Sequence, residues 1–415
     1  MNFARLNHIL IPDTKDGRDR FRHSRFGRIT RPLGVFYYGL TTEGRFLGVF
    51  WMLCGAAGLE VGSTQIYALW ALVTGLLCAS LLMRRAYRLD GCAVTVASPA
   101  RVTVGETIHL TVTVANPDST PIDAVGVVGP LLPWDGQYVG GVPAIPEVPA
   151  EGSAQCGVVA RFSARGEHHL DPFHLARIVP PGLGLGPALE TRGVRFLVVP
   201  EVANVVSVMV PGASRYQPGG GRAAASAPSA TEFAGVRPYR AGDRVRDLHA
   251  RLSGRAGFPV VREFREEYYP HVAIVLDCGF DRESRFELAV QLVAGVVARL
   301  SNSETLIDLV VGGTPAIRLP RGSGASEAGL DHLAMAAASP FDLVQIDQAL
   351  QDPQHTLSAV VFVTTVFDEE RRRLVAHLRE RGLSVTPVLV GQQVLEPGVT
   401  LVTEAELASG GAILL

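Results

Sequence analysis

The sequence predicts a membrane-anchored, multidomain protein: an N-terminal two-helix transmembrane hairpin, an antiparallel β-sandwich and a C-terminal doubly wound α/β domain. Three observations predict it: two uncharged apolar stretches, a middle region of alternating apolar and polar residues, and strands that alternate with helical patterns. The predicted parts are a basic cytosolic arm (1–40), the transmembrane hairpin (41–89), the sandwich (90–200), a flexible loop with an arginine-rich segment (201–265) and the α/β domain (266–415).

The composition restricts the class of protein. Of the 415 residues, 47% are hydrophobic and 19% charged, which excludes a mostly disordered chain. A net charge of −2 argues against a nucleic-acid partner. Of the 38 basic residues, Lys15 is the one lysine. A GC-rich genome would explain the arginines, and so would sites that need a planar guanidinium.

The transmembrane hairpin is predicted from residues 46–59 and 65–83, which carry no charge. The second stretch has about the 20 residues that cross a bilayer core, whereas the first crosses only if residues 60–64 reach the far interface. A hairpin buried in a globular core is the alternative, and the charges that flank both stretches count against it.

Arginine placement predicts the orientation of this hairpin. Bases precede the first stretch and follow the second, while the turn between them has Glu60 and no base. The positive-inside rule then leaves both termini and the bulk of the chain cytosolic, on a multi-pass protein of the inner (cytoplasmic) membrane. The bases are Arg28, Arg31 and Arg45 before, and Arg84, Arg85 and Arg88 after.

The sandwich is predicted from short alternating runs, such as residues 93–96 and 109–114, separated by turn signals. Its last strand is expected at residues 194–199, before Pro200.

The α/β domain begins with the apolar run 271–276, which is typical of a buried parallel strand. A helix is expected over 285–300, further strands over 306–311, 359–364 and 385–390, and a helix over 369–381 that stops at Gly382. Ligand crevices lie at the carboxyl ends of such strands, where we expect Asp277, Thr364 and Thr365.

Residues 211–231, rich in Gly, Ala, Ser and Pro, predict a flexible loop. The segment 232–267 that follows interleaves eight arginines with acidic residues. Its ordered residues resemble the signature of the domain-of-unknown-function fifty-eight family, although His249 stands where the family usually has tryptophan. The matching residues are Glu232, Phe233, Gly235, Arg237, Tyr239, Gly242, Asp243 and Arg246.

Further similarity to the family lies in residues 40–45, 165–166 and 171–173, so the resemblance covers most of the chain from about residue 40. It implies a bacterial inner-membrane protein whose α/β unit is similar to a von Willebrand factor A domain. Members are often encoded beside MoxR-type AAA+ ATPases. The implied partners are such an ATPase, other membrane proteins and the lipid bilayer, in an accessory role in assembling or maturing protein complexes.

The arginine-rich segment has two interpretations. Its guanidinium groups could clamp a carboxylate or phosphate of a partner. We favour the other, a salt-bridge lattice that docks the segment on the α/β sheet, with residues 260–264 as an edge strand, because acidic residues are interleaved throughout. The residues expected to serve partner binding or interdomain docking are Arg237, Tyr239, Gly242, Asp243, Arg246 and Arg251.

The resemblance also implies a metal site, because von Willebrand A domains bind Mg²⁺ through D-x-S-x-S. Residues 277–281 read DCGFD, so both serines are lost. Asp281 or Ser284 could substitute beside Asp277, with Thr364, Thr365 or Asp368 as a further ligand. A degenerate site without cofactor is favoured, in which Asp277 caps a helix or pairs with an arginine of the arginine-rich segment.

Other signals are weaker. Residues 167–174 hold three histidines, but neighbours in a strand point to opposite faces. Arg371, Arg372 and Arg373 are expected on a solvated helix face. No nucleophile with a base can be assembled, so the sequence favours a non-enzymatic, membrane-tethered adaptor. The alternatives are a Mg²⁺-dependent partner-binding module, and an envelope-linked hydrolase or transferase without an assigned site.

Overall fold

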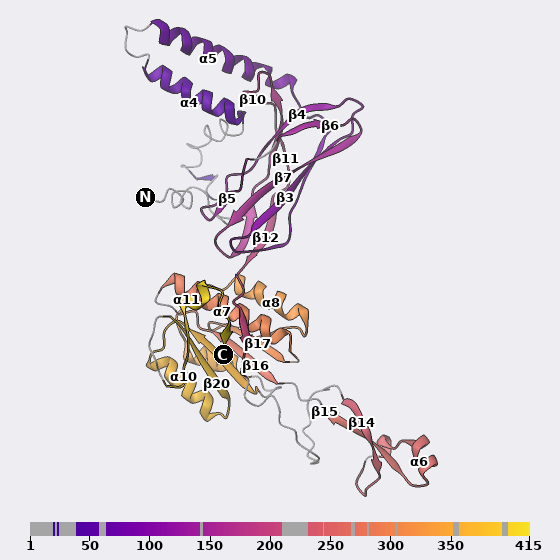
Figure 1. Cartoon of the computed structure of the whole chain (residues 1–415). Coiled ribbons are helices and arrows are strands. Elements are labelled where there is room, and N and C mark those ends of the chain that lie inside the picture. Colours follow the sequence, from indigo (N-terminus) through magenta and orange to yellow (C-terminus); the bar gives the residue numbers. More distant parts are fainter. Residues whose placement is uncertain are drawn as a thin grey trace. The chain divides into compact units, whose positions relative to one another are not determined.

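The computed structural model describes residues 20, 23–24, 39–57, 64–141, 144–209, 231–243, 245–266, 270–279, 282–303, 305–351, 357–391 and 397–415. The chain is a mixed α/β protein that divides into two compact units, residues 1–201 and 202–415 (Figure 1). Most of the predicted basic arm, and the predicted loop up to residue 230, lie outside the described residues.

The first unit begins with two helices, α4 (Thr42–Ala57) and α5 (Thr64–Met83), followed by the short helix η1 (Arg84–Ala86). The Trp51 and Trp70 rings stack at 5.7 Å, and Trp51 Nε1 donates a hydrogen bond to Thr74 Oγ1 at 2.7 Å. Within the described residues one helix, Gln65–Ala86, is long and apolar enough to cross a membrane. With 16 residues, α4 falls short of that length, so the described chain supports one crossing helix where the sequence predicted two.

Three sheets make up the rest of this unit: β1-β3-β7-β5, β10-β9-β4-β6 with β11 beside β9, and β2-β12-β8. Their strands are β1 (Ala93–Ala97), β2 (Arg101–Thr103), β3 (Thr107–Asn116), β4 (Ile122–Val128), β5 (Gly136–Tyr138), β6 (Ile145–Val148), β7 (Gly152–Phe162), β8 (Gly166–Leu170), β9 (His174–Val179), β10 (Gly184–Leu185), β11 (Leu189–Glu190) and β12 (Val194–Val199).

All three sheets contribute to one core. In β3, and in the second half of β7, every second side chain is buried, so Leu110 and Phe162 pack with Leu175 of β9 and Phe196 of β12. The strand predicted at 194–199 is confirmed as β12. The prediction of a purely antiparallel sandwich is wrong in one respect, because β2 pairs in parallel with β12.

The second unit contains a six-stranded sheet of order β18-β17-β16-β19-β20-β21, parallel except for the edge strand β18. Its elements are β16 (His271–Leu276), α7 (Glu283–Ser301), β17 (Leu306–Val311), β18 (Ile317–Arg318), α8 (Ser323–Ala334), α9 (Leu343–Ala349), β19 (Ala359–Thr364), α10 (Glu369–Glu380), β20 (Ser384–Gly391), β21 (Thr400–Thr403) and α11 (Glu404–Ala408). A small parallel pair, β13 (Val205–Ser207) and β22 (Ile413–Leu414), completes this part.

Every residue of β16 is buried because helices cover both faces of the sheet. Ile274 packs in a core with Leu292 of α7, whereas the neighbouring Val275 packs in a second core with Leu374 of α10. This arrangement is that of a doubly wound sheet, in which the strand order reverses between β16 and β19.

Residues 231–266, here named the arginine hairpin, form a two-stranded antiparallel sheet of β14 (Thr231–Pro238) and β15 (Val260–Glu266). The helices η2 (Val245–Asp247) and α6 (Ala250–Ala256) lie between the two strands in sequence. Among the described strands, β15 pairs with β14 and not with the six-stranded sheet, whose edges are β18 and β21. The predicted edge strand at residues 260–264 is therefore wrong, because β14 supplies its hydrogen-bonding partner.

Candidate functional site

The carboxyl ends of β16 and β19 bring two predicted residues together. Asp277 follows β16 and Thr364 ends β19, and Thr364 Oγ1 donates a hydrogen bond to Asp277 Oδ2 at 2.7 Å. The backbone N–H of Gly279 donates to Asp277 Oδ1 at 2.9 Å. Both predicted side chains are buried, at the point where the strand order reverses.

A guanidinium supplies the positive charge beside Asp277. Arg371 Nε donates to Asp277 Oδ2 at 2.5 Å, and Arg371 Nη1 donates to Asp368 Oδ2 at 2.7 Å. Asp368 also caps α10, because its Oδ1 accepts a hydrogen bond from the Arg371 backbone N–H. The side chains of Arg371 and Asp277 are only 7% and 1% exposed.

Two expectations are corrected here. Arg371 does not lie on a solvated helix face, since a carboxylate as buried as Asp277 requires a charged, hydrogen-bonded partner. That partner comes from α10 and not from the arginine-rich segment, because α10 begins directly after β19 and the Asp368 cap.

Among the other metal-ligand candidates, Thr365 Oγ1 donates to the Gly279 carbonyl oxygen at 3.5 Å. Ser284 is exposed in the first turn of α7, and no contact described for it reaches Asp277. Asp281 lies outside the described residues. In the described part of the chain no three His, Cys, Asp or Glu residues form a cluster that could hold a metal ion. Because the guanidinium already occupies oxygens of Asp277 and Asp368, the donor set does not fit the Mg²⁺ that the resemblance implies.

The arginine hairpin is shaped by three of its six predicted residues. Arg237 donates through Nη1 and Nη2 to both carboxylate oxygens of Asp243, at 2.7 and 2.8 Å. The Arg240 backbone N–H donates to Asp243 Oδ2 at 2.8 Å, and Gly242 adopts the left-handed φ of 106° in the same turn. The hydrogen bonds from Arg237 and from the Arg240 backbone lower the pKa of Asp243 to about 2.

The other three predicted residues face solvent. Tyr239 is 39% exposed, and Arg246 and Arg251 are exposed as well. Two apolar neighbours that the sequence did not single out, Val245 and Phe258, are 73% and 50% exposed. An open hollow of about 490 Å³ lies in the same segment, lined by Leu248, Ala250, Ser253, Gly254, Gly257, Phe258 and Pro259.

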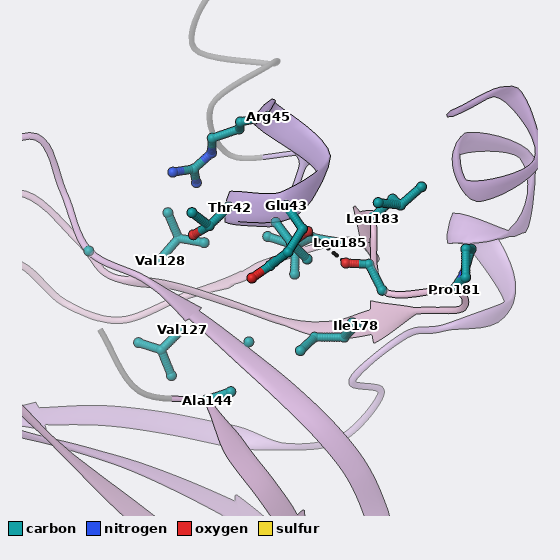
Figure 2. A pocket seen from close by; sticks show the side chains of 14 residues that line it. Thr42, Glu43, Arg45, Val127, Val128, Ala144, Ile178, Pro181, Leu183 and Leu185 are labelled. Carbon is teal, nitrogen blue, oxygen red and sulfur yellow. Dashed lines mark hydrogen bonds between the residues drawn. The ribbon is translucent and has the colours of Figure 1, made fainter. Parts of the chain in front are cut away.

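A larger pocket, of about 500 Å³, lies in the first unit and was not predicted (Figure 2). The first turn of α4 contributes Glu43 and Arg45, which face the apolar side chains of Val127 and Val128. Two of its lining residues are joined by a hydrogen bond, which Thr41 Oγ1 donates to the Gly182 carbonyl oxygen at 2.6 Å. With one base and one acid in its wall, the pocket offers no charge selection.

The histidines of residues 167–174 do not converge. His168 is buried and its Nε2 lies 2.7 Å from Asp135 Oδ2, a partner that is distant in sequence. The next residue, His169, points to the other side of β8, as the alternation of a strand requires.

No protein-family model and no curated protein matches this chain. Among solved structures, the native conformation of alpha-2-macroglobulin from E. coli aligns with 31% of this chain and 8% of its own, at 14% identity and a TM-score of 0.21. An inactive mutant of the GH20 exo-β-N-acetylglucosaminidase from Vibrio harveyi aligns with 70% of this chain and 60% of its own, at 8% identity and a TM-score of 0.18. The structure of the Vibrio harveyi GH20 exo-β-N-acetylglucosaminidase in complex with N-acetylglucosamine aligns with 72% of this chain and 57% of its own, at 10% identity and a TM-score of 0.17. Likenesses this weak carry no argument about fold or function.

Proposed function

We propose that this chain is a membrane-associated, non-enzymatic adaptor that binds a partner protein through the arginine hairpin. The observation that carries the proposal is the outward display of Tyr239, Phe258 and Arg246 on a segment that is held together internally. Every hydrogen bond and ion pair described for residues 231–266 stays within that segment. Exposed tyrosine, phenylalanine and arginine side chains are typical of protein-binding surfaces.

Charge indicates the kind of partner. The arginine hairpin has eight arginines and five acidic residues, so an acidic surface with an apolar patch would complement it. We place the chain in the domain-of-unknown-function fifty-eight family on the signature residues. A MoxR-type AAA+ ATPase is therefore the proposed partner, with other membrane proteins second. In this proposal the second unit is a von Willebrand factor A-like domain. The order of its large sheet supports this: when β16 is counted as strand 1, the order is 3-2-1-4-5-6, and strand 3 (β18) is antiparallel.

The proposed location is the bacterial inner membrane, with α4 and α5 inserted as a hairpin and both termini cytosolic. Large apolar side chains exposed on both helices support it, for example Phe46 and Leu82. Arg84 and Arg85 follow α5 at the predicted cytosolic end. A reporter enzyme that works only in the cytoplasm should be active when it is fused to the C-terminus. Activity of a fused reporter that works only outside the cytoplasm would overturn this topology.

Site-specific photocrosslinking in membranes tests the adaptor function. A photoreactive residue replaces Phe258 in the arginine hairpin, and a matched probe replaces Met335, which follows α8 and is similarly exposed (50% against 59%). We expect a stoichiometric crosslink to an AAA+ ATPase from position 258 and none from position 335.

Variants of the exposed set refine the test. Exchanging Tyr239→Ser together with Arg251→Glu should reduce the crosslink from position 258 at least tenfold. Equal crosslinking from both probes would refute the arginine hairpin as the docking element. A specific crosslink to another class of protein would support the adaptor function but refute the AAA+ ATPase as its partner.

A further inference from the structure

We infer that the guanidinium of Arg371 takes the place of a divalent cation at the carboxyl ends of β16 and β19, so that the α/β unit needs no metal there, and that removing this guanidinium opens a site for Mg²⁺ or Mn²⁺. The inference concerns the chemistry of this unit and does not depend on the proposed partner.

Two carboxylate oxygens contact the guanidinium of Arg371. Asp277 Oδ2 lies 2.5 Å from Arg371 Nε, and Asp368 Oδ2 lies 2.7 Å from Arg371 Nη1. Thr364 Oγ1 lies 2.7 Å from the same oxygen of Asp277. Two carboxylates and a hydroxyl, from two strand ends and the N-cap of α10, are the hard donors that Mg²⁺ prefers. Here one arginine side chain bridges the carboxylates instead.

The space around the guanidinium of Arg371 fits a planar cation. The Phe341 ring lies under the guanidinium, with Arg371 Cζ 4.3 Å from the ring centroid. On another side Gly279 leaves the necessary room, since a Cβ at that position would lie 2.7 Å from Arg371 Nη2. The backbone and the aromatic ring thus form a slot for the guanidinium.

The electrostatics of the site also favour a guanidinium over a divalent ion. Asp277 is almost fully buried, and its charge is costly without a cation. Arg371 supplies one positive charge on a fork that reaches both carboxylates, which a lysine ammonium cannot do. A divalent ion added beside it would be repelled by the guanidinium and would find the Asp277 and Asp368 oxygens already in use.

Metal-dependent stability of the full chain in detergent tests the inference. Thermal unfolding of the wild type is expected to be the same with EDTA and with millimolar Mg²⁺ or Mn²⁺. Arg371→Ala should lower the unfolding temperature of the second unit by several degrees, and Mn²⁺ should restore part of the loss. Mn²⁺ binding, read by electron paramagnetic resonance, should appear in this variant and disappear in Arg371→Ala with Asp277→Asn.

The matched control is Arg373→Ala, because Arg373 lies on the same helix with its side chain 70% exposed. It should change neither stability nor metal response. If Arg371→Ala fails to fold, Arg371→Gln replaces it, because glutamine keeps hydrogen-bond donors but has no charge. The metal dependence of wild-type unfolding tests the inference without any variant. Stabilisation of the wild type by Mg²⁺ that Asp277→Asn abolishes would overturn the inference. So would an Arg371→Ala or Arg371→Gln variant that folds and binds no Mn²⁺.

Discussion

Among the described residues, the buried carboxylates of Asp277 and Asp308 each accept a hydrogen bond from an arginine, and Asp308 on β17 adds a histidine to this arrangement. Its carboxylate accepts hydrogen bonds from His271 Nε2 at 2.8 Å and from Arg318 Nε at 3.0 Å. Burial would raise the pKa of Asp308, but the hydrogen bonds from His271 and Arg318 outweigh it and lower the pKa to about 2. Nothing in the sequence indicated this cluster, because its members lie on three different strands.

Replacing Asp308 tests its contribution to stability. Its pKa is lowered from an ordinary 3.8 to about 2, so its stabilising effect is complete above about pH 4 and is lost as the pH falls through 2. Asp308→Asn should cost about 2 kcal/mol at pH 7, in line with that shift. Denaturant unfolding of the full chain between pH 7 and pH 2 should show a steep fall for the wild type and a flatter curve for the variant. Glu380→Gln, an exposed change on α10, is the control; equal curves for wild type and Asp308→Asn would contradict the assignment.

Asp243 organises the turn of the arginine hairpin, so Asp243→Asn should loosen it. Amide exchange over residues 239–247 should become faster, because the bidentate contact with Arg237 loses its charge. Lowering the pH of the wild type from 4 through 2 should also reduce the protection of these amides, because Asp243, with its pKa at about 2, then loses its charge. Asp247→Asn serves as the control, as the Arg246 contact to Asp247 is long, at 3.9 Å. Unchanged exchange in Asp243→Asn would show that the turn is held by other contacts.

At this scale the sequence predicted the meeting of Asp277 and Thr364 but not the role of Arg371. Strand ends follow from apolar runs, and parallel strands place their carboxyl ends together. A run of three arginines after two glutamates, however, has the pattern of any exposed helix face. Only the buried carboxylate of Asp277, distant in sequence, distinguishes Arg371 from its neighbours.

At the scale of elements, glycines let the sandwich approach the two N-terminal helices closely. A Cβ at Gly44, in the first turn of α4, would lie 1.9 Å from the Leu183 carbonyl oxygen, and one at Gly186 would lie 1.9 Å from that of Tyr87. Arg84 Nε donates to the Leu185 carbonyl oxygen at 2.5 Å across the same junction. The sequence did not predict this junction, because close approach of two backbones leaves no periodic pattern.

Gly44→Ala should therefore weaken the junction. The added methyl meets backbone, which cannot rotate away, so a loss of about 1–3 kcal/mol is expected. Thermal unfolding of the full chain in detergent measures it. Gly75→Ala on α5 is the matched control, because a Cβ there has no atom of the described structure within 4 Å and alanine favours a helix. Equal stability of the two variants would contradict the close approach.

Several elements of the α/β domain were predicted closely, whereas α8, with 12 residues, and the shortest elements were not. The strand β16 and the helix α10 follow from an apolar run and from a 3.6-residue period with a cap, and both lie within a residue of the predicted bounds. The strand β18 has two residues and α9 has seven, too few for a period to emerge. Pairing with β17 and packing against the sheet, rather than local sequence, define them.

At the scale of the whole molecule, the net charge of −2 is a cancellation. Residues 1–89 carry twelve basic and five acidic residues, whereas residues 266–415 carry ten and twenty. The basic excess and the acidic excess thus lie in different parts of the sequence and offset each other in the total. At Arg371 the slot between two carboxylates and a ring suits a planar guanidinium.

The two units have separate hydrophobic cores, and we expect them to lose stability separately. Ile108 in the first and Ile274 in the second are both fully buried, so the same Ile→Val exchange removes one methyl group from either core. Each exchange should cost about 0.5–1.5 kcal/mol. Hydrogen exchange of the full chain should show faster global exchange only in residues 90–201 for Ile108→Val and only in residues 270–415 for Ile274→Val. If either exchange lowers protection equally in both units, the chain unfolds as one cooperative body and its two cores are energetically coupled.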